Sequence, residues 1–127
     1  MKIILAGAGG IGSHLAKLLS YENHDIILID IDQERLDSVY NQLDILSIKG
    51  DAASRSVLYQ AEVGKADLFM AVTTSEHTNL VSAILAKKMG AKQTIARVEN
   101  PEFLAEDQLA IFKELGVDII ISPDNLV

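Results

Sequence analysis

Three observations predict an α/β fold in which six parallel strands form one doubly wound sheet. Short apolar runs alternate with helical patterns six times along the 127 residues. The apolar runs lack polar alternation, which is typical of parallel strands buried on both faces. The first run leads directly into a glycine-rich turn, Gly7-Ala8-Gly9-Gly10-Ile11-Gly12. Because parallel strands need right-handed crossovers, we expect a Rossmann-type sheet in the order 3-2-1-4-5-6 with helices on both faces.

The expected elements follow one another without a long loop or a low-complexity segment. Continuous apolar runs predict the strands, and apolar residues at helical spacing predict the helices. The predicted strands are residues 2–6, 26–29, 43–48, 68–72, 94–98 and 117–121. The predicted helices are residues 10–21, 33–41, 54–62, 76–89 and 101–115.

Apolar residues recur on one side of each longer helix, and this side should face the sheet. They are Ile11, Leu15, Leu18 and Leu19 in the first helix, Leu36 and Val39-Tyr40 in the second, and Leu80, Ile84 and Leu85 in the fourth. Glycines mark the helix ends, since glycine readily adopts the left-handed conformation that closes a helix. Gly64, Gly90 and Gly116 should therefore end the third, fourth and fifth helices, and Pro101 suits the first turn of the fifth.

The glycine-rich turn has the spacing Gly-x-Gly-x-x-Gly at Gly7, Gly9 and Gly12. Gly7 allows a tight turn off the strand, Gly9 lets a pyrophosphate approach the backbone, and Gly12 lets the helix pack closely. Free N–H groups and the helix dipole favour an anion at the start of the helix. The spacing alone is a weak signal, but a strand before it, a helix after it and an acid at the next strand end strengthen it. The turn therefore predicts a nucleotide-binding site.

Asp30 ends the second strand, 18 residues after Gly12. This is where a ribose-binding acid is expected in a dinucleotide fold. Its carboxylate would accept both adenosine-ribose hydroxyls and would repel a 2′-phosphate, which favours NAD over NADP. The alternative is a solvated acid at a strand end. Nearby, Arg35 could stack over the adenine or pair with a neighbouring acid.

Other candidate contacts stand at the ends of the third, fourth and fifth strands. Asp51 and Ala52 would border the adenine, although Gly50-Asp51 also reads as a simple turn. Thr73 and Thr74 lie opposite the glycine loop, where they could meet ribose or phosphate, while Thr74 or Ser75 could cap the next helix.

Arg97 is an isolated cation in an otherwise apolar strand. A charge there is costly unless it is paired or near solvent. Contact with a ligand phosphate is one solution, and a salt bridge to Glu99 or Asp51 is the other. We favour the ligand or interface role.

Composition excludes several functional classes. The net charge of −7 and the absence of a basic patch argue against nucleic-acid binding. The chain has no cysteine, which removes disulfide and thiol chemistry and fits the cytoplasm. No apolar run approaches the roughly 20 residues that span a bilayer. The three histidines, His14, His24 and His77, are dispersed, and no ligand spacing predicts a metal site. No region remains for a substrate domain, so we expect no catalysis.

Several motifs together resemble the regulator-of-potassium-conductance (RCK or KTN) N-terminal domain family. They are Gly7 to Gly12, Asp30, Gly50-Asp51-Ala52, Ala66-Asp67, Ala71-Val72-Thr73-Thr74-Ser75, Asn79, Ile95-Ala96-Arg97-Val98 and the late Leu115-Gly116-Val117-Asp118 with Ile121-Ser122-Pro123. The resemblance covers essentially the whole chain. One departure is visible, since the family often has two acids where this chain has Glu76-His77.

The resemblance implies a cytoplasmic regulatory subunit of a potassium uptake transporter. In such proteins the nucleotide-binding lobe assembles into dimers or rings on the inner face of a Trk-type pore subunit, and NAD(H), or ATP and ADP in some members, gates potassium flux. The family's nucleotide contacts map onto Gly7 to Ile11, Asp30, Thr73-Thr74 and Arg97.

We expect residues 1–127 to form a single domain, because the strands and helices of one nucleotide-binding fold account for all of them. Ser122-Pro123-Asp124-Asn125 looks like the start of another helix, so we expect this domain to be the N-terminal part of a longer chain. The competing hypothesis is the cofactor domain of an NAD-dependent oxidoreductase whose catalytic domain is absent here.

Overall fold

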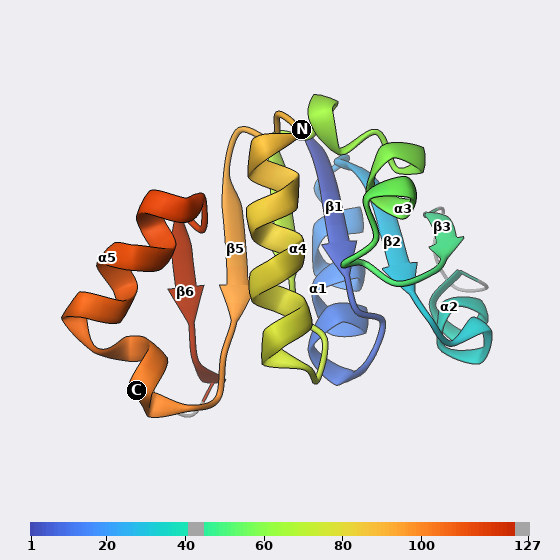
Figure 1. Cartoon of the computed structure of the whole chain (residues 1–127). Coiled ribbons are helices and arrows are strands. Elements are labelled where there is room, and N and C mark those ends of the chain that lie inside the picture. The colour runs from blue at the N-terminus through green and yellow to red at the C-terminus, as the bar shows by residue number, and fades with distance from the viewer. Residues whose placement is uncertain (41–44, 124–127) are drawn as a thin grey trace.

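Six parallel strands form one sheet in the order β3-β2-β1-β4-β5-β6, which confirms the predicted fold class (Figure 1). The structure is a computed structural model that describes residues 1–40 and 45–123. The strands are β1 (Lys2–Ala6), β2 (Asp25–Asp30), β3 (Leu46–Lys49), β4 (Leu68–Ala71), β5 (Thr94–Arg97) and β6 (Ile119–Ile121). The third strand was predicted over residues 43–48, of which 43 and 44 lie outside the described residues.

Helices cover the sheet from both sides, with α4 in front of it and α1 behind it in Figure 1. The α-helices are α1 (Gly10–Ser20), α2 (Gln33–Tyr40), α3 (Arg55–Gln60), α4 (Glu76–Lys88) and α5 (Glu106–Leu115). Two 3₁₀ turns, η1 (Val63–Lys65) and η2 (Pro101–Leu104), complete the described elements. None of the helices in residues 1–40 and 45–123 is long and apolar enough to cross a membrane.

Alternating side chains of each strand divide the interior into two cores. Ile3 and Leu5 of β1 belong to the core that includes Ala16 of α1 and Leu36 of α2. Ile4 and Ala6 belong to the other core, which includes Phe69, Leu58 of α3 and Leu80 of α4. Because both faces of the central strands are buried, these strands read as continuous apolar runs in the sequence.

The glycine loop is held by close backbone packing. Gly7 has φ +113°, and a Cβ there would lie 2.9 Å from the backbone nitrogen of Thr73 on β4's end. A Cβ on Gly12 would collide with the carbonyl of Gly7. By contrast, a Cβ on Gly9 or Gly10 would meet no atom within 4 Å. Two glycines therefore shape the loop, and two leave open space above it.

Some predicted details of the helices are wrong. Leu18 does not face the sheet but is 50% exposed, and the small residues Gly12 and Ala16 are the buried side of α1. Helix α3 ends at Gln60 rather than near Gly64, because Glu62 adopts the left-handed conformation with φ 58°. Gly64 instead permits close packing, since a Cβ there would approach the carbonyl of Met89 to 2.8 Å.

The last predicted helix is also divided. Asn100 caps the turn η2 by accepting a hydrogen bond from the N–H of Glu102, and the extended backbone of Ala105 separates η2 from α5. This break lets Phe103 pack edge-to-face on Phe112 with ring centroids 5.6 Å apart. Gly116 ends α5 in the left-handed conformation, as predicted. The further helix predicted from Ser122 falls largely on residues 124–127, outside the described residues.

Gly12→Ala should destabilise the domain, whereas Gly10→Ala should not. The added Cβ at position 12 meets the Gly7 carbonyl, and overpacking of this kind costs about 1–3 kcal/mol. At position 10, the first residue of α1, the methyl group meets no atom of the described residues within 4 Å, so we expect no such cost. Urea denaturation of the two variants measures both changes. Equal stabilities would contradict the packing role of Gly12.

Candidate functional site

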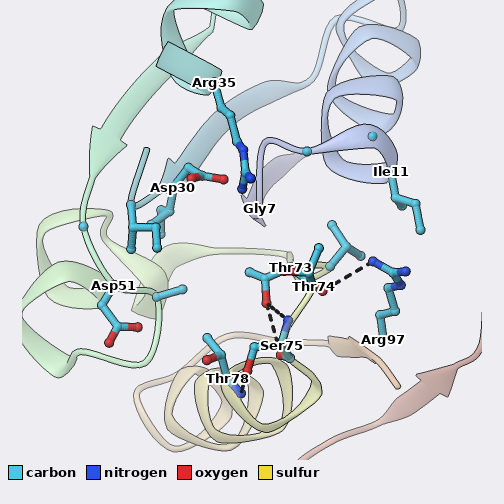
Figure 2. Close-up of a pocket in the computed structure, with 17 residues that line it drawn as sticks. Gly7, Ile11, Asp30, Arg35, Asp51, Thr73, Thr74, Ser75, Thr78 and Arg97 are labelled. Carbon is cyan, nitrogen blue, oxygen red and sulfur yellow. Dashed lines mark hydrogen bonds between the residues drawn. The ribbon is translucent and has the colours of Figure 1, made fainter. Parts of the chain in front are cut away.

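A cleft of about 230 Å³ lies at the carboxyl ends of the strands, around the switch point between β1 and β4 (Figure 2). Ligands of open α/β sheets bind at such a point. Its wall combines the glycine loop with the turns that follow β2, β3 and β4. The cleft is lined by Gly7, Gly9, Gly10, Ile11, Ile29, Asp30, Ile31, Arg35, Gly50, Asp51, Ala52, Val72, Thr73, Thr74, Ser75, Thr78 and Arg97.

Most of the predicted contact residues line this cleft together. Two do not. Ala8 is buried beside it and points its N–H at Asp30, and Gly12 lies beneath the loop. In the described part of the chain no side chain caps the start of α1, so the first N–H groups of this helix have no side-chain acceptor there. Unpaired N–H groups at a helix N-terminus are suited to an anion.

Asp30 is buried, with 7% of its surface exposed, and both its carboxylate oxygens accept backbone hydrogen bonds. The N–H of Ala8 donates to Oδ2 at 2.7 Å, and the N–H of Asp32 donates to Oδ1 at 2.8 Å. Each carboxylate oxygen has a second lone pair, so the group retains capacity to accept a ligand hydroxyl. The interpretation of Asp30 as a merely solvated acid is therefore wrong.

Asn79 connects the ends of β4 and β5 from the first half of α4. It is fully buried, and its amide donates to the carbonyls of Thr73 and Arg97 at 3.0 and 2.9 Å. Its oxygen accepts from the N–H of Thr73 at 2.9 Å and from the Thr73 hydroxyl at 2.6 Å. The Thr73 hydroxyl is thus hydrogen-bonded within the turn that follows β4. The helix α4 is capped by the side chain of Ser75. Asn79 fixes the cleft without lining it.

The positive charge of the partly buried Arg97 is paired with Glu99, one of the two acids that the sequence suggested as its partner. Its Nη2 lies 2.7 Å from the Glu99 carboxylate, whereas Nη1 makes only a long 3.4 Å contact with the carbonyl of Thr73. Its Nε is buried and has no hydrogen-bond partner among residues 1–40 and 45–123. The guanidinium, which lies on the Ile11 side of the cleft in Figure 2, has five N–H donors, and the bond to Glu99 uses only one nitrogen of the group, so donors remain for a ligand.

The opposite end of the cleft combines apolar and charged groups. Ile31 is 68% exposed although it is large and apolar, and Arg35 reaches toward Asp30 and the glycine loop (Figure 2). Arg35 also pairs with Asp32 at 3.6 Å, an exposed contact of little energetic weight. The carboxylate of Asp51 accepts the N–H of Ala53, which shapes the turn after β3.

Sequence reasoning missed Ile31, Thr78 and Val72 as lining residues. Nothing in the sequence marked Thr78 or Val72, because a threonine in a helix and a valine at the end of a strand occur in any fold of this kind whether or not they line a cleft. Ile31 did carry one, since a large apolar residue directly after a strand-ending acid interrupts an otherwise polar turn. His77 is exposed and makes an edge contact with Phe103 outside the lining set.

Glu76 ties the start of α4 to the segment after β5. Its carboxylate accepts the N–H groups of Asn100 and Glu99, each at 3.0 Å. These two hydrogen bonds lower the pKa of Glu76 from its ordinary value of 4.5. Within residues 1–40 and 45–123, no group of three or more His, Asp or Glu side chains could hold a metal ion.

The TrkA-N domain family matches residues 3–123 of the chain. A curated relative, the Trk system potassium uptake protein TrkA homolog of Archaeoglobus fulgidus, is 47% identical over 125 residues, which cover 97% of this chain and 28% of the relative. The chain therefore spans little more than a quarter of that relative's length.

Solved structures share the fold. The TrkA-N domain of the inner membrane protein YbaL from Escherichia coli has a TM-score of 0.81 at 18% identity, covering 97% of this chain and 87% of that one. The GsuK channel bound to NAD has a TM-score of 0.77 at 17% identity, with coverages of 94% and 21%. GsuK bound to ADP has a TM-score of 0.73 at 23% identity, with coverages of 95% and 30%.

The Glu76→Gln variant should be less stable to unfolding than wild type at neutral pH, and this difference should disappear in acid. Because the folded-state pKa is below 4.5, the carboxylate stabilises the fold fully above that value and progressively less as the pH falls through the folded pKa. Urea denaturation at pH 7 and at lower pH measures the difference from wild type. Glu114→Gln on exposed α5 is the control, expected to match wild type at pH 7. A difference that grows on acidification would contradict the role of Glu76.

Proposed function

The chain belongs to the TrkA-N domain family, and we propose that it is a non-catalytic regulatory domain that binds NAD(H) or a related adenine nucleotide. The observation that carries this proposal is the cleft in which the glycine loop, the buried Asp30 carboxylate and Arg97 converge. Such a combination suits a ligand with a diphosphate between two differently recognised ends.

The diphosphate would lie over Gly9 and Gly10, where no atom would stand within 4 Å of a Cβ. There its oxygens would accept hydrogen bonds from the N–H groups at the start of α1 and would lie at the positive end of the helix dipole. Arg97 would meet the phosphates from the β5 end, using donors that Glu99 leaves free. Thr73 and Thr74 would contact the same part of the ligand.

The adenosine half would lie toward β2 and β3. The Asp30 carboxylate would accept the ribose hydroxyls, and the adenine would cover the exposed Ile31 between Asp51-Ala52 and Arg35. A 2′-phosphate would meet the negative charge of Asp30, which supports NAD(H) over NADP. That GsuK has been solved with NAD and with ADP supports a shared preference for the adenosine diphosphate portion.

We propose that the bound nucleotide controls a potassium-translocating membrane protein, as the name of the Archaeoglobus fulgidus relative suggests. The domain would act from the cytoplasmic side, as one lobe of a homo-oligomer at the N-terminal end of a longer chain. A ligand shifts such an assembly only by binding its two states with different affinity. NAD(H) or an adenine nucleotide would therefore gate transport without being consumed.

Calorimetric titration with NAD, NADH, NADP, ATP and ADP tests the binding proposal. We expect NAD(H) to bind more tightly than NADP, and Asp30→Ala to weaken NAD(H) by about 1–3 kcal/mol, the range for lost charge-assisted hydrogen bonds. A preference for ATP or ADP would keep the regulator and change its signal. Unchanged NAD(H) affinity in Asp30→Ala would remove Asp30 from the site, and no binding by any of the five would refute the nucleotide proposal.

Gly9→Val should abolish nucleotide binding while leaving the domain folded. The side chain enters space where a Cβ meets no atom within 4 Å, so it blocks the diphosphate without displacing protein atoms. Circular dichroism and thermal unfolding confirm the fold, and the same titration measures affinity. Tight binding by a folded Gly9→Val variant would place the diphosphate elsewhere.

A further inference from the structure

Three of the segments that line the cleft, the glycine loop and the turns after β2 and β3, are hydrogen-bonded to Asp30. Its side chain accepts the N–H of Ala8 in the glycine loop and the N–H of Asp32 at the start of α2. Its backbone carbonyl accepts the N–H of Gly50 after β3, at 2.9 Å. One buried residue thus holds together three separate segments of the cleft wall.

Apart from the close backbone packing at Gly7 and Gly12, the described residues place few restraints on the glycine loop. Backbone hydrogen bonds fix its two ends, from Gly7 N–H to the carbonyl of Ile29 at 2.7 Å and from Ser13 N–H to the carbonyl of Gly9 at 2.8 Å. Between them, Asp30 is the one side chain in the described part of the chain that accepts a hydrogen bond from a loop N–H. Glycines can adopt more backbone conformations than other residues. The hydrogen bond from Ala8 to Asp30 therefore removes conformational freedom that a glycine-rich loop would otherwise have.

We propose that Asp30 is a positioning residue for the diphosphate site as well as a ribose contact. By accepting a hydrogen bond from the Ala8 N–H, its carboxylate orients the glycine loop so that the next N–H groups, at Gly9, Gly10 and Ile11, face the cleft. The ligand then meets donors that are already arranged, and it does not have to order a loop of glycines on binding. This inference rests on the proposed nucleotide function and assigns Asp30 a second role within it.

Electrostatics makes the two roles separable. Asp30 carries negative charge beside a site for an anion, so removing that charge without other effect should strengthen phosphate binding. A residue that acts only through the ribose hydroxyls should not affect a ligand that lacks them. The positioning role predicts the opposite sign, because loss of the carboxylate loosens the loop that holds the phosphates.

Amide hydrogen exchange of the ligand-free chain, followed by NMR, tests the loop directly. In Asp30→Asn we expect exchange at Ala8 to accelerate on the order of tenfold or more, since its N–H is the loop amide that the Asp30 carboxylate protects and local opening governs its exchange. Asp51→Asn is the matched control, because it removes the same charge from the same cleft, and the one hydrogen bond of this carboxylate within the described residues comes from the Ala53 N–H and not from the glycine loop. Loop exchange unchanged in Asp30→Asn, or accelerated equally in both variants, would overturn the proposal.

Titration with ADP and 2′,3′-dideoxy-ADP connects the loop to binding. The dideoxy compound offers Asp30 no hydroxyl, yet we expect it to bind Asp30→Asn several-fold more weakly than wild type. Equal or tighter binding would overturn the positioning role and leave the ribose role intact. If wild type binds neither NADH nor ADP, the proposed function fails, while the exchange result still decides the positioning role. Asp30→Glu replaces Asp30→Asn if the latter does not fold, because its longer side chain also displaces the carboxylate.

Discussion

The close approach of β1, α1 and β4 around the glycine loop is the constraint on which the rest of the structure depends. Gly7 turns the chain with φ +113° directly against the backbone of Thr73, and Gly12 lies under the Gly7 carbonyl. Any side chain at either position would separate the helix from the sheet. Because the approach is made by backbone atoms, it leaves the helix N-terminus bare, and the cleft forms above it.

Sequence reasoning predicted the sheet order and the location of most strands, because buried parallel strands and glycine turns leave strong local patterns. It failed where long-range packing decides. The helix predicted over residues 101–115 is divided at Ala105, which lets Phe103 pack on Phe112, and Gly64 permits close packing against Met89 rather than ending a helix. The site residues were predictable as positions at strand ends. Their hydrogen bonds were not, since Asn79 and Asp30 act through backbone groups far away in sequence.

The cleft is fixed by side chains that bond mainly to backbone. Asn79 joins the ends of β4 and β5, the Asp30 carboxylate joins the turns after β1 and β2, and Glu76 joins α4 to the segment after β5. Arg97 and Arg35, by contrast, are held by acid partners at the rim. A cleft floor fixed by these hydrogen bonds, with charged groups at both ends, suits the nucleotide-binding role that we propose.

The most direct test of a nucleotide site in this cleft is an NMR titration of the ¹⁵N-labelled chain with NADH. We predict that the largest amide shifts occur at Gly9, Gly10, Ile11 and Thr74, with further shifts around Asp30. The second pocket, lined by Tyr59, Glu62, Val63, Gly64, Lys65 and Met89, should not respond. Shifts concentrated in that second pocket, or none at the glycine loop at saturating NADH, would contradict it.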